Sequence, residues 1–147
     1  MAKRLRLHIF LLILVFITAG KAQAQYDKQQ FFYRGQHLLF EGRYQQAIDN
    51  FNKLIQLDPN LHEAYFFRGI GKYNLGDFLG ARADFDKALS IHPIFTLAYH
   101  YRAITNSRLG DYENALADLQ EAIDLRPGYN GLYFSRGVTY LLSQQFK

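Results

Sequence analysis

Four arginines in this 147-residue chain stand 34 residues apart, at Arg34, Arg68, Arg102 and Arg136. Other columns of glycine, aromatic residues, alanine and proline keep the same step. The glycine and proline columns are Gly42, Gly76 and Gly110, then Pro59, Pro93 and Pro127. A fixed period of this length is typical of chains built from one repeated structural unit. We therefore expect a stack of similar units.

Each unit is predicted to be two helices joined by a tight turn. In the second unit no proline interrupts residues 63–75, and Gly76 then breaks the helical pattern as a turn residue does. The next stripe has the i, i+3, i+4, i+7 spacing of a buried helix face and consists of Ala81, Asp84, Phe85 and Ala88. Pro93 ends this second helix, because proline cannot continue one. Gly69 is expected where the two helices cross, since its small size allows close approach.

With these residues the chain resembles tetratricopeptide repeat proteins. The second unit carries the pattern at Tyr65, Gly69, Gly76, Phe78, Ala81, Phe85, Ala88 and Pro93. The third carries it at Tyr99, Ala103, Gly110, Tyr112, Ala115, Leu119, Ala122 and Pro127. The first unit departs from it at Leu54, where the others have alanine. The resemblance implies an all-α solenoid of helix-turn-helix units, in which each hairpin buries its outer faces against the next.

The expected organisation has three full repeats and the first helix of a fourth. We expect a signal peptide at residues 1–24, a short linker at 25–27, repeats at 28–61, 62–95 and 96–129, and a partial repeat at 130–147. The helix of the partial repeat is apolar almost all round, whereas a terminal repeat should turn a polar face to water. Either the array continues beyond Lys147 or another subunit covers this helix.

The first 24 residues have the pattern of an export signal. Three basic residues precede an apolar run over residues 9–19, and Ala22-Gln23-Ala24 has the form of a cleavage site. Cleavage after Ala24 would leave Gln25 first. An uncleaved anchor helix is the alternative, but the apolar run is shorter than the about 20 residues that a bilayer requires. We therefore expect a periplasmic or secreted protein with no stable membrane span after cleavage.

Composition argues against several classes of function. The leader holds four of the 17 basic residues and no acidic one, which leaves 13 basic and 13 acidic residues in the rest. A nucleic-acid partner therefore loses its electrostatic support. The absence of cysteine excludes disulfides, thiol catalysis and thiolate metal sites. No arrangement of serine, histidine and acid forms a nucleophile motif, and no histidines stand at metal-ligand spacing. We expect no catalysis, no cofactor and no metal.

The recurring arginines are expected to be structural. Arg68 faces the second helix of its own hairpin, where Asp84 lies within the buried stripe, and Arg102 has the same relation to Asp118. A half-buried charge is tolerated mainly when it is paired and hydrogen-bonded. The first unit has Asn50 in place of the aspartate, and the sequence holds no equivalent partner for Arg136. A ladder of ligand-binding arginines is the alternative.

The inner wall of the predicted solenoid is the candidate binding surface. The resemblance places the first helix of each unit on the concave side. The residues expected there are Phe32, Gln36, Leu39, Phe66, Ile70, Tyr73, His100, Ile104, Ser107, Phe134, Val138 and Leu141. This wall is mainly apolar, and a contiguous apolar strip indicates a binding surface or an interface with more protein.

The predicted function is a non-catalytic scaffold that docks a peptide or helix of a partner protein on this wall. Some tetratricopeptide proteins hold the terminal carboxylate of a chaperone tail with cationic and amide side chains. The corresponding places here carry Phe32, Gln36, Phe67, Leu97 and Tyr101, so that ligand class is not expected. Two alternatives stay open. The chain is the sensing or assembly arm of a longer envelope protein, or it self-associates through its C-terminal helix.

Overall fold

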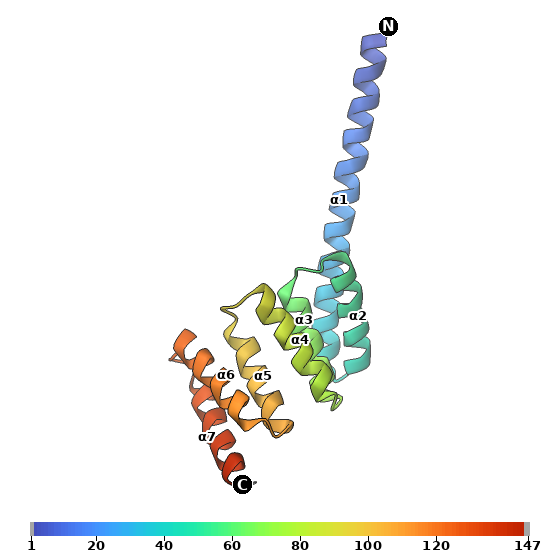
Figure 1. Cartoon of the computed structure of the whole chain (residues 1–147). Coiled ribbons are helices and arrows are strands. Elements are labelled where there is room, and N and C mark those ends of the chain that lie inside the picture. Colours follow the sequence, from blue (N-terminus) through green and yellow to red (C-terminus); the bar gives the residue numbers. More distant parts are fainter. Residues whose placement is uncertain (1, 146–147) are drawn as a thin grey trace.

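The computed structural model describes residues 2–145, with the side chains of residues 13–144, and this part of the chain folds into seven helices without strands (Figure 1). The helices are α1 (Ala2–Phe40), α2 (Tyr44–Leu57), α3 (His62–Asn74), α4 (Phe78–Ile91), α5 (Thr96–Arg108), α6 (Tyr112–Leu125) and α7 (Asn130–Gln145). The predicted all-α solenoid of three hairpins plus one helix is confirmed. Phe146 and Lys147, the last residues of the expected partial repeat, lie outside the described residues.

Glycine closes each of the three hairpins. Gly42, Gly76 and Gly110 have φ angles of 74°, 82° and 79°. This left-handed conformation strains residues that carry a Cβ atom, which explains why the glycine recurs at the 34-residue step. The helices that follow the second and third turns begin at Asp77 and Asp111, whose carboxylates accept hydrogen bonds from the amides of Gly80 and Asn114. These aspartates satisfy amides that a helix start leaves unpaired.

The two helices of a hairpin cross at a glycine that receives an aromatic ring. A Cβ atom added to Gly35 would lie 2.6 Å from the ring of Phe51, and one added to Gly69 would lie 2.7 Å from Phe85. Both rings are fully buried. The third hairpin has a larger residue, Ala103, in this column and a smaller one, Leu119, opposite. The packing volume at the crossing is therefore maintained by a paired change.

Successive hairpins stack through their first helices. Cα atoms of α1 and α3, of α3 and α5, and of α5 and α7 approach within 8 Å, whereas none do so between the second helices α2, α4 and α6. The stack therefore curves with its first helices on the inner side. At the seam between the second and third hairpins, the Phe66 ring lies 4.8 Å from Phe95 and 5.5 Å from Tyr101, measured between centroids.

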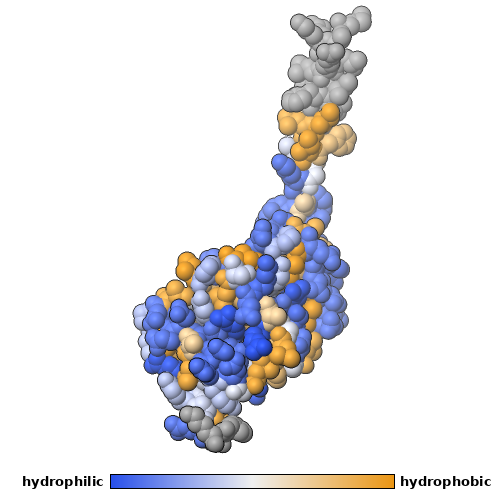
Figure 2. All heavy atoms as spheres, viewed as in Figure 1, coloured by the Kyte–Doolittle hydropathy of each residue, from blue (hydrophilic) through white to orange (hydrophobic). Residues whose placement is uncertain are grey.

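Helix α1 extends beyond the solenoid as one continuous rod (Figure 1). The linker expected at residues 25–27 is helical, because neither proline nor glycine interrupts residues 21–34. An apolar run of this rod, Ile13–Ile17, is exposed and stands clear of the packed hairpins (Figure 2). Over the part of the chain that the structure describes, no helix combines the length and apolar character needed to cross a membrane.

Candidate functional site

An open cleft of about 350 Å³ lies on the inner side of the solenoid, between α3, α5 and α7. Its lining is mixed, with apolar side chains from all three helices and a few hydroxyl groups. The residues that line it are Tyr73, Ile104, Ser107, Arg108, Phe134, Ser135, Val138, Thr139 and Leu142. The cleft exists because the inner faces of three successive first helices converge there, so no single unit forms it.

Five residues of the predicted wall meet in this cleft. They are Tyr73, Ile104, Ser107, Phe134 and Val138. Phe134 is the most open of them, with 76% of its surface exposed, and Val138 is 39% exposed. These apolar side chains in contact with water favour a ligand that covers them.

Two residues of the predicted wall are buried, which corrects the sequence analysis. Phe66 is 3% exposed and His100 is 8% exposed. Their position on the first helix points to the next hairpin rather than to the inner surface. Phe66 meets Phe95 and Tyr101 there, and His100 meets Ser135 of α7. Phe134 occupies the same column and is exposed, because no further hairpin covers α7 within the described residues.

The remaining wall residues do not join the cleft. Phe32 lines a separate hollow of about 240 Å³ between α1 and the loop after α2. Gln36, Leu39 and Ile70 are half-buried and line neither space, and Leu141 is exposed outside the cleft. The predicted wall is thus divided, and its continuous part lies at the C-terminal end.

The cleft also contains residues that the sequence analysis missed. Arg108 lies at the rim, where its Nε donates a hydrogen bond of 3.2 Å to the Tyr73 hydroxyl. Its column in the repeat holds Phe40, Asn74, Arg108 and Leu142, and this variation hides any shared role. Only the geometry of the stack brings Arg108 and Leu142 to the same surface.

Hydroxyl groups join α5 and α7 at the edge of the cleft. Ser107 and Thr139 are hydrogen-bonded at 3.1 Å, and Thr139 also donates to the backbone carbonyl of Ser135 at 2.9 Å. His100 Nε2 lies 2.8 Å from Ser135 Oγ. These contacts fix α7 against α5, which holds the cleft in one shape.

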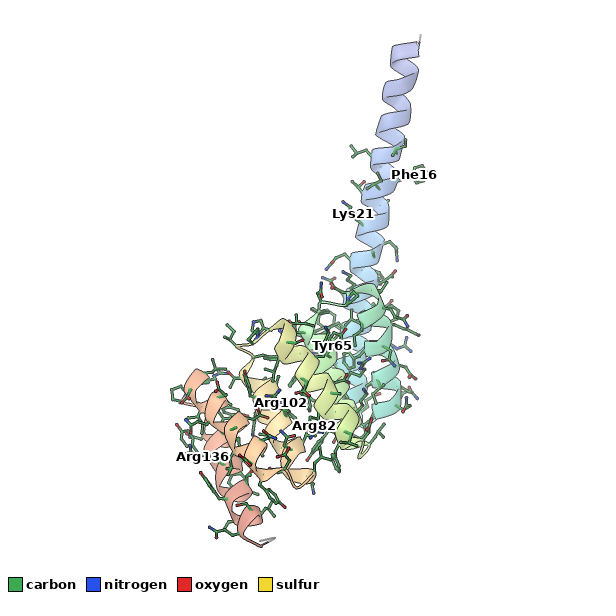
Figure 3. All side chains as sticks on the ribbon, in the orientation of Figure 1. Phe16, Lys21, Tyr65, Arg82, Arg102 and Arg136 are labelled. Carbon is green, nitrogen blue, oxygen red and sulfur yellow. The ribbon has the colours of Figure 1, made fainter. Side chains whose placement is uncertain are left out.

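The recurring arginines each bridge three helices. Arg68 donates to both carboxylate oxygens of Asp84 at 2.9 and 2.6 Å, and its third bond, at 2.7 Å, reaches Asn52 of the preceding hairpin. Arg102 contacts Asp118 at 2.9 and 2.5 Å and Asp86 of the preceding hairpin at 2.7 Å (Figure 3). The sequence analysis paired each arginine only within its own hairpin. The contact to the preceding one is a second regular interaction, 16 residues upstream.

The ladder weakens at both ends. In the first unit no hydrogen bond joins Arg34 to Asn50 among the described residues, because the Asn50 amide donates to the Gln46 carbonyl instead. In the fourth unit Arg136 donates to Gln120 of the preceding hairpin at 3.1 Å. Burial raises the pKa of Asp118, but its hydrogen bonds from Arg102 and Asn106 act against this rise and favour the ionised form.

Histidines at the seams make the fold sensitive to acid. The rings of His62 and His92 are stacked, with centroids 4.4 Å apart. Burial lowers the pKa of His62 below its ordinary value, the Glu63 carboxylate opposes this shift, and the His92 ring adds to it. Burial also lowers the pKa of His100. Both groups therefore bind protons more readily in the unfolded chain than in the folded one.

Acidification should consequently destabilise the protein through these histidines. Their contribution is fully present above the ordinary histidine pKa of 6.5 and is lost as the pH falls below it toward the lowered folded values. Urea unfolding near neutral pH and near pH ~5 measures the loss. The double variant His62→Gln, His100→Gln should lose less stability over this range than the parent. His37→Gln, a change on the exposed face of α1, should not, and an equal loss in all three proteins would exclude this origin.

In the described residues, no three histidine or acidic side chains are grouped so that they could hold a metal ion. The cleft therefore offers packing surface, hydroxyl groups and one guanidinium group. This arrangement is suited to binding a segment of polypeptide through apolar contacts with a polar anchor at the rim.

Residues 29–61 and 96–129 match the family model of the tetratricopeptide repeat. A comparison with curated proteins gives no match. Among solved structures, the first TPR domain of human RPAP3 is similar with a TM-score of 0.78 at 21% identity, over 80% of this chain and 93% of that one. The TPR2B domain of yeast Sti1 in a pHsp70 complex has a TM-score of 0.73 at 21% identity, over 82% and 98% of the two chains. The MamA crystal structure has 0.74 at 21% identity, over 80% and 70%.

Proposed function

On the premise that the chain folds as a tetratricopeptide repeat solenoid, we propose that it is a non-catalytic scaffold that binds a peptide segment of a partner protein in the cleft between α3, α5 and α7. The observation that carries the proposal is the convergence of exposed Phe134 and Val138 with Tyr73 and Ile104 on one concave surface. An apolar side chain of the ligand would fill this space.

Arg108 gives the proposed ligand a preferred polarity. Its guanidinium group is exposed at the rim and held by Tyr73, so four of its five N–H donors are free of that bond. A carboxylate or backbone carbonyl of the ligand would be bound there. The proposed ligand is therefore a short segment with an apolar anchor and an acidic residue beside it.

Similar folds in the comparisons support a peptide ligand but not its identity. The first TPR domain of Spaghetti (RPAP3) was solved with the HSP90 peptide SRMEEVD, and the second TPR domain of human RPAP3 with the HSP70 peptide SGPTIEEVD. At identities of 22% and 19%, these likenesses extend to the fold alone. Phe32, Gln36 and Phe67 stand where a carboxylate clamp is expected, so we propose a different class of peptide.

The proposal is tested with peptides selected from a random display library on the immobilised full chain. We expect Val138→Asp to weaken the selected peptides about tenfold or more, because it places a charge in the apolar contact. Leu79→Asp is the matched control, since Leu79 is also an exposed aliphatic residue of a helix but lies on α4, away from the cleft. Equal effects of the two changes, or no selected peptide, would overturn the proposed function.

We also propose that residues 1–24 direct export and are removed after Ala24. The exposed apolar run Ile13–Ile17 and the position of this segment beyond the packed hairpins support this, since its removal would leave the core intact. Mass spectrometry of the protein from a secreting host should then give a chain that begins at Gln25. An intact N-terminus would contradict the proposal and favour an uncleaved anchor.

A further inference from the structure

The face of α7 that corresponds to the hairpin interior is open. Each earlier first helix, α1, α3 and α5, packs against a second helix, namely α2, α4 or α6. In the described chain α7 packs only on α5 and α6. The features that receive a second helix in the earlier hairpins can therefore be compared directly with the same features on α7.

Gly137 is the first of these features. It lies in the column of Gly35 and Gly69, whose positions are filled by the rings of Phe51 and Phe85. No described atom lies within 4 Å of a Cβ atom placed on Gly137. The aromatic residues Tyr133 and Tyr140 of α7 are 40% and 52% exposed. The notch that accepts an aromatic ring elsewhere in the molecule is thus present and unfilled.

Arg136 is the second feature. Arg68 and Arg102 each bind a buried aspartate with two hydrogen bonds, and each guanidinium group lies 5.4 Å from a tyrosine ring of its own helix. Arg136 has the same relation to Tyr133, at 5.4 Å, and its bond to Gln120. It contacts no carboxylate among the described residues. The guanidinium group is therefore positioned as in the other units, without its acid.

A cleft of about 920 Å³ is the third feature. It runs between the start of α6 and the end of α7, and it is lined by residues that include Asp111, Leu116, Tyr140 and Ser143. In the hairpins α3–α4 and α5–α6, the second helix begins next to the end of the first. A helix docked antiparallel on α7 would have its N-terminal turn in this cleft.

We propose that α7 binds an amphipathic helix of a separate polypeptide that carries alanine, aspartate, an aromatic or leucine residue, and alanine at the spacing A-x-x-D-[F/L]-x-x-A. The molecule itself supplies the template. Ala81, Asp84, Phe85 and Ala88 present this face to α3, and Ala115, Asp118, Leu119 and Ala122 present it to α5. The aspartate pairs with Arg136 and the aromatic ring enters the Gly137 notch. This site lies on a different face of α7 from the cleft of the proposed function and does not depend on it.

A fluorescent peptide with the sequence of residues 77–92, which contains α4 and its caps, tests the proposal by anisotropy titration against the full chain. We expect saturable binding that weakens about tenfold or more when the peptide carries Asp84→Asn or Phe85→Ala. In the protein, Gly137→Val fills the notch and should weaken the parent peptide to a similar extent. Arg136→Ala should abolish the difference between the parent and the Asp84→Asn peptide.

Control variants distinguish this face of α7 from the cleft between α3, α5 and α7. Val138→Asp, which acts in that cleft, should leave binding of the α4 peptide within about twofold. Absence of binding, or binding that Gly137→Val does not change, would overturn the proposal. Sedimentation analysis covers the remaining occupant. A dimer of the full chain that Gly137→Val dissociates would identify a second copy as the occupant and would also overturn it.

Discussion

Replacing Asp84 with alanine is expected to destabilise the protein by about 3–5 kcal/mol. The carboxylate is 3% exposed, accepts both bonds from Arg68 and lies 2.9 Å from the Lys72 ammonium group. Its removal leaves two half-buried cations without an acid, and such groups cost far more than a lost surface pair. Thermal unfolding should show a melting temperature lower by on the order of 10 °C.

Asp86→Ala is the matched control for this change. Asp86 lies two residues further along the same helix and pairs with Arg102 at 2.7 Å, but its side chain is 54% exposed. Water screens this pair, so its loss should cost about 1 kcal/mol or less. If Asp84→Ala and Asp86→Ala lower the melting temperature equally, burial does not determine the strength of these pairs.

The ladder gives the stack more than internal pairs. Because Arg102 binds Asp118 of its own hairpin and Asp86 of the preceding one, each arginine couples two neighbouring units. Stability in a solenoid is the sum of unit and interface terms, so such bridges contribute to both. The weaker contacts of Arg34 and Arg136 indicate that this coupling is strongest between the second and third hairpins.

The fold could be predicted from the sequence because its determinants are local and repeated. Gly76 and Pro93 set the turn and the helix end within their own unit, and the 34-residue step copies them along the chain. The partners Arg68 and Asp84 were identified for the same reason, since both lie on the facing stripes of one hairpin.

The candidate site was harder to predict because it depends on how the units stack. The helical spacing of Phe66 cannot distinguish a residue of the open wall from one at the seam, and the stack covers it with Phe95. The rim residue Arg108 has no counterpart in its column, so the period gave no signal for it. Asn52 and Asp86, the partners in the preceding hairpin, were missed because pairing was sought only within one unit.

Gly69→Ala should destabilise the protein by about 1–3 kcal/mol through overpacking, partly offset by the higher helix propensity of alanine. The added Cβ atom would lie 2.7 Å from Phe85 Cε1, and the fully buried ring cannot move without disturbing the hairpin interior. Urea unfolding measures the loss. Gly137→Ala is the matched control, because it adds the same atom in the same column where no described atom lies within 4 Å. It should leave stability unchanged or raise it by up to about 1 kcal/mol.

The third hairpin indicates how the loss at Gly69 can be reversed. Ala103 and Leu119 occupy there the positions that Gly69 and Phe85 occupy in the second hairpin, and both are fully buried. Phe85→Leu alone should leave a void, whereas Gly69→Ala with Phe85→Leu reproduces the packing of the third unit. The double variant should therefore be more stable than the sum of the single losses predicts, by about 1 kcal/mol or more. Strict additivity would contradict the view that a ring and a missing side chain at each helix crossing form a single packing unit.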